Sequence, residues 1–381
     1  MSQYPQDAQR PEGAAQSSVT PGAVPPNPAP VPEPVEGQLP MPSTPMPQVE
    51  LPVADGAYHQ FWRTPLWRWW RPVAALLVGA LIFVGITILA SSLAIGIDVA
   101  TGRRTVEEVR NASQGNVTAT PALFLINNLS LAALIPVGML LGRWFFRQPG
   151  GWLSSITGRL RWGWLGRCFA VLLPLWVVYI GAETWLQARS PEGLGLAVNR
   201  DTWLLVVGIL LTTPFQAAGE EYGFRGVITR ALASFFGHRW VGLAAGAVVS
   251  SVLFMLSHFA DDPWLNLFYF CFGLIACAMT LRTGGLEASI AMHVVNNVLS
   301  EATMPFSDIS GIFDRQVGAG DPTVLIGILV PLIGWALVEW QARCHQIVRT
   351  AAPGLERQRQ LEQQLATWQQ QMIAWQRHQQ H

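Results

Sequence analysis

Long apolar runs alternate with short polar connections along most of the chain. Because an α-helix needs about 20 apolar residues to cross a bilayer core, each run predicts a membrane span. The run 288–299 fits least well, since it is short and contains polar residues. The pattern predicts an all-α polytopic membrane bundle of about eight transmembrane helices. The expected spans cover 73–97, 122–141, 165–182, a run from 203, a run from 241, 265–281, 288–299 and 324–338.

The two ends of the chain have a different composition. Residues 1–58 are rich in Pro, Ala, Gln and Ser without hydrophobic periodicity, which predicts a disordered tail. The transmembrane bundle is expected at 59–350. Residues 351–381 are Gln-rich with apolar residues at a 4-3-4-3 spacing, which predicts an amphipathic helix that either lies on the membrane or self-associates. Those apolar residues are Leu361, Leu365, Trp368, Met372 and Trp375.

Composition supports the membrane assignment. Half of the 381 residues are hydrophobic, 13% are charged, and the mean hydropathy is +0.29. These values argue against a soluble globular protein. The four cysteines show neither a zinc-finger spacing nor a disulfide framework. We therefore expect a lipid bilayer and a membrane-associated peptide or protein as partners, and no nucleic acid.

Arginine placement predicts the orientation of the bundle. Arginines gather before the first span and in the loops that eight spans would put on the same side, so both termini are expected in the cytoplasm. The loop 98–121 opposes this reading, because it carries three arginines, although acidic residues accompany them. The predicted location is the cell membrane.

Ionisable residues inside apolar runs point to function, because they are costly in a membrane. Glu220, Glu221 and Arg225 end the run that begins at 203. Residues four apart share a helix face, so Glu221 and Arg225 are expected to neutralise one another. Glu220 is rotated by about 100° from Glu221, which leaves it free to face a site.

Two later pairs complete a candidate catalytic set. Phe254 and His258 are four residues apart at the end of one run, and His293 and Asn297 are four apart in another. A carboxylate can take a proton from water, an imidazole can orient that water or bind a metal, and His and Asn donors can stabilise an oxyanion. Together, the carboxylate, the two imidazoles and the carboxamide supply the groups that hydrolysis requires.

Each motif also has a structural interpretation. Glu-Glu with Arg is often an ion pair at a span end, a lone His often bonds a helix-end carbonyl, and His with Asn often joins packed helices. The catalytic interpretation is favoured over these structural ones only if the three motifs come together in the fold. If the fourth and fifth helices form a hairpin turning near Gly237, Glu220 and His258 lie at similar heights, roughly 25 to 32 Å from the turn.

The three motifs resemble those of the CPBP intramembrane proteases. That family includes the eukaryotic type II CAAX prenyl endopeptidases and the bacterial Abi or bacteriocin-immunity proteins. The resemblance covers roughly 203–301 and rests on Glu220-Glu221-x-x-x-Arg225, Phe254-x-x-x-His258 and His293-x-x-x-Asn297. It implies an eight-helix bundle with a cavity open toward the cytosol and the bilayer.

The resemblance also implies roles for individual residues. Glu220 would be the general base, His258 would help to activate water, and His293 and Asn297 would bind a metal or stabilise the oxyanion. Glu220, His258 and His293 could bind zinc with an open position. A zinc-dependent and a metal-independent glutamate mechanism both stay open, since the H-E-x-x-H helix of ordinary zincins is absent.

The expected function is therefore intramembrane hydrolysis of a peptide bond in a membrane-anchored or amphipathic polypeptide. The substrate of the family is not transferred, because nothing in the sequence indicates prenylation. Two other classes stay open: a non-catalytic immunity or peptide-binding membrane protein that uses the same cavity, and a transporter with a Glu and His proton relay. The absence of a repeat between the halves of the chain speaks against transport.

Overall fold

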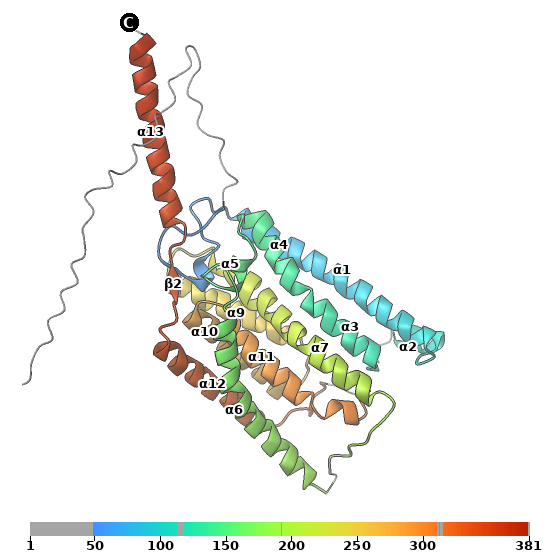
Figure 1. The fold of residues 1–381 in the computed structure, drawn as a ribbon. Helices are drawn as coiled ribbons and strands as arrows, with labels where there is room; N and C mark the ends of the chain where they lie inside the picture. The colour runs from blue at the N-terminus through green and yellow to red at the C-terminus, as the bar shows by residue number, and fades with distance from the viewer. Residues whose placement is uncertain (1–48, 113–117, 192, 311, 313–314, 380–381) are drawn as a thin grey trace, which may run out of the picture. The chain divides into compact units, whose positions relative to one another are not determined.

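The computed structural model describes residues 49–112, 118–191, 193–310, 312 and 315–379, which are almost entirely helical (Figure 1). The 1–48 part of the predicted tail lies outside these residues. The short elements are β1 (Gly56–Ala57), η1 (Tyr58–Gln60), α2 (Val106–Ala112), α5 (Gly151–Ser154), η3 (Met304–Phe306) and β2 (Thr350–Ala351). The other helices are α1 (Trp70–Ala100), α3 (Pro121–Ala132), α4 (Leu134–Phe146), α6 (Trp162–Ala188), α7 (Thr202–Glu221), η2 (Tyr222–Ile228), α8 (Thr229–Ala233), α9 (Arg239–Leu256), α10 (Pro263–Thr283), α11 (Glu287–Ser300), α12 (Val324–Cys344) and α13 (Leu355–Gln379).

The all-α membrane fold is confirmed. Within the described residues, 7 helical stretches are long and apolar enough to cross a membrane. They correspond to seven of the eight expected spans, with α3 and α4 forming one stretch and α7 to α8 another. The chain is therefore an integral membrane protein. The remaining expected span, 288–299, is α11.

Helix α11 differs from the other expected spans in length and in burial. Its 14 residues extend about 21 Å, which is shorter than a hydrocarbon core of about 30 Å. It packs between α6 and α7 and also contacts α10 (Figure 1). Its first residue, Glu287, is fully buried and accepts hydrogen bonds from the Arg161 backbone N–H and guanidinium at 2.7–2.9 Å. Protein contacts therefore replace the lipid contacts that a full span would make.

Both ends of the bundle lie on one side. Strand β1, before α1, pairs antiparallel with β2, after α12. Arg282 near the end of α10 also pairs with Glu339 near the end of α12 at 2.6 Å. The ends of α10 and α12 are thus neighbours, so α11 and the segment after it return the chain across the bundle before α12 begins. The chain therefore crosses the bundle an even number of times, as it would with eight spans.

Helix α10 shows how local sequence sets the bounds of these elements. Asp262 precedes Pro263 and accepts hydrogen bonds from the backbone N–H groups of Trp264 and Leu265 at 2.8 and 3.0 Å. An acidic N-cap followed by proline is a strong start signal. The helix ends where Gly284 adopts a left-handed backbone with φ of 68°, which glycine accepts without steric cost. This turn carries the chain directly into α11.

The segment before α1 is packed more extensively than its sequence predicts. The buried Glu50 side chain accepts a hydrogen bond from Arg71 at 2.6 Å, within residues assigned to the predicted tail. Aromatic residues alternate with arginines at 61–71, a pattern typical of lipid headgroup boundaries, yet Phe61 and Trp62 are fully buried, and Trp62 stacks on Phe146 at 4.1 Å. The structured part of the chain therefore begins before residue 58. A pattern of aromatics and arginines alone does not reveal these tertiary contacts.

Residues Leu355–Gln379 of the Gln-rich C-terminal segment form the helix α13. Whether this helix lies on a membrane or associates with a second copy stays a prediction.

Candidate active site

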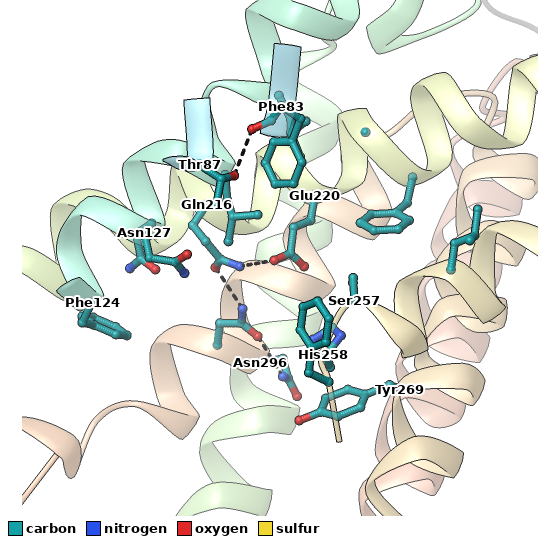
Figure 2. A pocket seen from close by; sticks show the side chains of 18 of the residues that line it. Phe83, Thr87, Phe124, Asn127, Gln216, Glu220, Ser257, His258, Tyr269 and Asn296 are labelled. Atoms are coloured by element: carbon teal, nitrogen blue, oxygen red, sulfur yellow. Dashed lines mark hydrogen bonds between the residues drawn. The ribbon is translucent and has the colours of Figure 1, made fainter. Parts of the chain in front are cut away.

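The three motifs belong to neighbouring elements around one cavity. Glu220 and Glu221 end α7, His258 follows α9, and His293 and Asn297 lie on α11. A cavity of about 1720 Å³ is lined by Glu220, His258 and Asn297, together with largely apolar residues of α1, α3, α4 and η2. Figure 2 shows Glu220 on one wall, with His258 and Tyr269 across from it.

Close contact between two backbones sets the position of the acidic pair. Gly219 directly precedes Glu220, and a Cβ atom at Gly219 would lie 2.1 Å from the carbonyl oxygen of Leu131 on α3. Only glycine permits this approach. This contact holds α7 against α3 directly before Glu220 and Glu221.

A π-helical segment, η2, follows the two acids. The carbonyl oxygen of Phe224 in this segment accepts the backbone N–H of Thr229 and also the hydroxyls of Thr229 and Ser250, at 2.9 Å each for the hydroxyls. Such segments inside α-helices are frequent at functional sites. Here the segment carries Arg225 into the bundle interior, where it is 1% exposed.

Glu221, Arg225 and His293 form a buried cluster. Arg225 Nη1 donates to Glu221 Oε1 at 2.9 Å, and His293 Nδ1 lies 2.8 Å from the same oxygen. Because an ionised carboxylate only accepts hydrogen bonds, Nδ1 of His293 carries a proton. The Arg225 guanidinium also lies 4.4 Å from the centre of the Phe254 ring. The expected pairing of Glu221 with Arg225 is therefore observed, and it also fixes the His293 ring.

Glu220 is held differently. Gln216 Nε2 donates to Glu220 Oε1 at 2.6 Å. Within the described residues, Oε2 has no hydrogen-bond partner, and Nε2 of His293 lies 3.5 Å from it. Glu220 is 7% exposed and reaches the cavity.

A chain of hydrogen bonds from α6 through α11 ends on Glu220. Trp176 Nε1 donates to Asn296 Oδ1 at 3.2 Å, Asn296 donates to Asn297 at 3.1 Å, and Asn297 donates to Gln216 Oε1 at 3.0 Å. The indole can only donate, so it sets the orientation of every amide that follows. Each donor in turn polarises the next, which strengthens the last bond to the carboxylate. We call these residues the amide relay; Figure 2 shows its bonds from Asn296 to Glu220.

Sequence analysis missed Gln216, Asn296 and Trp176. Gln216 is four residues before Glu220 on α7, and Asn296 directly precedes Asn297, so helical spacing could have indicated Gln216 as a partner. No spacing rule connects Trp176 with α11, because their contact depends on how α6 packs in the bundle.

His258 lines the same cavity as Glu220. Its Nδ1 lies 2.8 Å from the carbonyl oxygen of Phe254, and its ring stacks on Tyr269 at 3.8 Å. The carbonyl only accepts, so Nδ1 carries the proton and Nε2 presents a lone pair. Arg315 donates to the His258 carbonyl oxygen at 2.6 Å and fixes the turn after α9.

The three proposed zinc ligands are not assembled into a metal site. In the part of the chain that the structure describes, no three His, Cys, Asp or Glu side chains are grouped to hold one ion. His293 contacts Glu220, but the ring of His258 is held against Tyr269 by its bond to the Phe254 carbonyl. Glu220, His258 and His293 thus stay a predicted ligand set that is not grouped around one point within the described residues, and we derive no step through a metal.

Fold and site together define an integral membrane protein with a buried acid and histidine cluster at a cavity. Residues 202–299 match the family described as type II CAAX prenyl endopeptidase Rce1-like. The chain is also similar to the uncharacterized protein YyaK of Bacillus subtilis (strain 168), with 24% identity over 211 residues that cover 52% of this chain and 68% of that protein. No solved structure is a significant match. The family match covers the part of the chain that carries the three motifs, and it confirms the resemblance drawn from them.

Proposed function

We propose that the protein is an intramembrane endopeptidase that cleaves a peptide bond in a membrane-anchored or amphipathic polypeptide. The observation that carries the proposal is the state of Glu220. One oxygen is fixed by Gln216, the other lies 3.5 Å from Nε2 of His293 without a hydrogen-bond partner among the described residues, and the side chain lines the cavity. A general base needs this combination of fixed orientation and a free lone pair.

In the proposed reaction, the Glu220 carboxylate takes a proton from a water molecule in the cavity. The water oxygen attacks the carbonyl carbon, and the carbonyl oxygen becomes an oxyanion. When the C–N bond breaks, the leaving amine takes the proton from Glu220. A carboxylic acid and an amine result, and Glu220 returns to its starting state.

The other candidate residues support this step. His258 can accept a hydrogen bond from the water through Nε2, because Nδ1 is bonded to the Phe254 carbonyl. Asn297 uses one N–H on Gln216, which leaves its second N–H for the oxyanion. Glu221 and Arg225 hold His293 beside Glu220. Glu221 and Arg225 are positioning residues in this scheme.

The test compares membrane proteomes of cells that express wild-type protein, Glu220→Gln or Glu107→Gln at equal levels. Glu107 is an exposed acid of α2 that does not line the cavity, so its change to Gln is a matched control. New peptide termini are expected with wild type and Glu107→Gln and not with Glu220→Gln. Identical termini in all three, with the proteins folded in the membrane, would instead favour a non-catalytic peptide-binding protein.

A further inference from the structure

The cavity contains a second carboxylate whose position is fixed. Glu301, directly after α11, lines the same cavity as Glu220. Thr213 Oγ1 donates to Glu301 Oε2 at 2.7 Å, and Asn128 Nδ2 donates to Thr213 Oγ1 at 3.1 Å. Asn128 is 4% exposed and Thr213 is fully buried. A chain of buried donors from α3 through α7 therefore holds Glu301 in place.

Glu301 differs from the structural acids of the bundle in having no cation beside it. Glu221, Glu287 and Glu339 each pair with an arginine at 2.6–2.9 Å. Among the described residues, Glu301 forms no ion pair with an arginine. A carboxylate inside a membrane protein is costly without a partner and is commonly functional.

The lining of the cavity has an excess of acid. Its described charged side chains are the guanidinium of Arg315 and several carboxylates, and Arg315 is engaged by the His258 carbonyl. Glu220 Oε2 also lacks a hydrogen-bond partner within the described residues, in a side chain that is only 7% exposed. The molecule in this cavity must therefore satisfy two fixed carboxylates, of which Glu220 has the catalytic role. The carboxylates of the lining are those of Glu183, Glu220, Glu301 and Asp308.

We propose that Glu301 binds a basic side chain, lysine or arginine, of the polypeptide that Glu220 cleaves. The proposal rests on the proposed function. Thr213 and Glu220 are seven residues apart on α7, so they share a face about 10 Å apart along the axis. An extended polypeptide covers this distance in about three residues. The basic residue is therefore expected about three positions from the cleaved bond.

The experiment is the terminus comparison, now with wild type, Glu301→Gln and Glu107→Gln. Wild-type cleavage sites are expected to be enriched in Lys or Arg about three residues from the new terminus. Loss of a hydrogen-bonded charge partner should lower this enrichment about tenfold in Glu301→Gln. Glu107→Gln should retain the enrichment. Sites without a basic residue at that position should be cleaved equally by all three proteins.

Reversal of the charge provides a second arm, because Glu301→Lys should select acidic residues at the same position. If Glu301→Gln does not accumulate in the membrane, Thr213→Val, which removes the donor that holds Glu301, should also weaken the enrichment. Wild-type sites without enrichment, or enrichment that persists in these variants, would overturn the subsite and leave the proposed function standing. A lack of any Glu220-dependent termini would overturn the proposed function itself.

Discussion

At the scale of single residues, the two neighbouring acids of the site have different partners. Glu221 is bonded to Arg225 and His293 and is fully buried, whereas Glu220 is bonded to Gln216 and faces the cavity. Their side chains point to different partners because successive residues of a helix are rotated by about 100°. One acid can therefore organise the cluster while the other meets water and substrate.

The amide relay leads to the first residue-scale prediction. Gln216→Leu removes the donor to Glu220 and leaves Asn297 without its acceptor, so Glu220 loses its fixed orientation. A hydrogen bond to a charged group is worth about 1.5–3 kcal/mol, which predicts a fall in kcat of about ten- to a hundredfold. The measurement is the rate of cleavage of a substrate identified by the terminus comparison, with KM determined separately.

The control is Gln187→Leu, the same change at an exposed position of α6. It should retain wild-type kcat. A purely structural role for Gln216 would lower the amount of folded protein while leaving kcat per folded molecule unchanged. That result would contradict the idea that the amide relay orients Glu220 for catalysis.

At the scale of elements, the sequence predicted more of the fold than of the site. Span positions followed from apolar length, and the Glu221 and Arg225 pair followed from helical spacing. The π-helical segment η2 did not, since no propensity distinguishes Tyr222–Ile228 from an ordinary helix. Trp176 and Glu301 were also missed, because their partners Asn296 and Thr213 lie 120 and 88 positions away. Contacts of this kind depend on packing between helices.

The contact between α3 and α7 leads to an element-scale prediction. In Gly219→Ala, the new Cβ would lie 2.1 Å from the backbone oxygen of Leu131, so one helix must shift. Overpacking of this kind costs about 1–3 kcal/mol. A lower midpoint of thermal unfolding in detergent is expected, measured by the intrinsic fluorescence of the 17 tryptophans.

Gly181→Ala provides the comparison, because nothing lies within 4 Å of a Cβ at that position of α6. Alanine is favoured over glycine in a helix by about 1 kcal/mol, so this variant should be unchanged or slightly more stable. Equal midpoints for Gly219→Ala and Gly181→Ala would show that α3 and α7 are not held together by backbone contact.

At the scale of the whole molecule, the structure fixes which ends share a side, and arginine placement predicts which side is cytoplasmic. Strands β1 and β2 place the start of α1 beside the end of α12. The opposite side holds the end of α1 and the start of α7, which Arg103 and Asp201 join by an ion pair. Since arginines concentrate on the β1 and β2 side, that side should face the cytoplasm.

Cysteine labelling tests this orientation. Cys344, at the end of α12, is exposed, and Ser190, after α6, is an exposed residue on the opposite side. A membrane-impermeant maleimide added to intact cells should label Ser190→Cys in a Cys344→Ala background. It should label Cys344 in the wild-type protein only after the cells are permeabilised. Labelling of Cys344 in intact cells without labelling of Ser190→Cys would show that the protein has the opposite orientation. The polypeptide that is cleaved would then have to be oriented in the opposite direction across the membrane to reach Glu220. The reason is that the position of the cavity is fixed relative to residues 190 and 344.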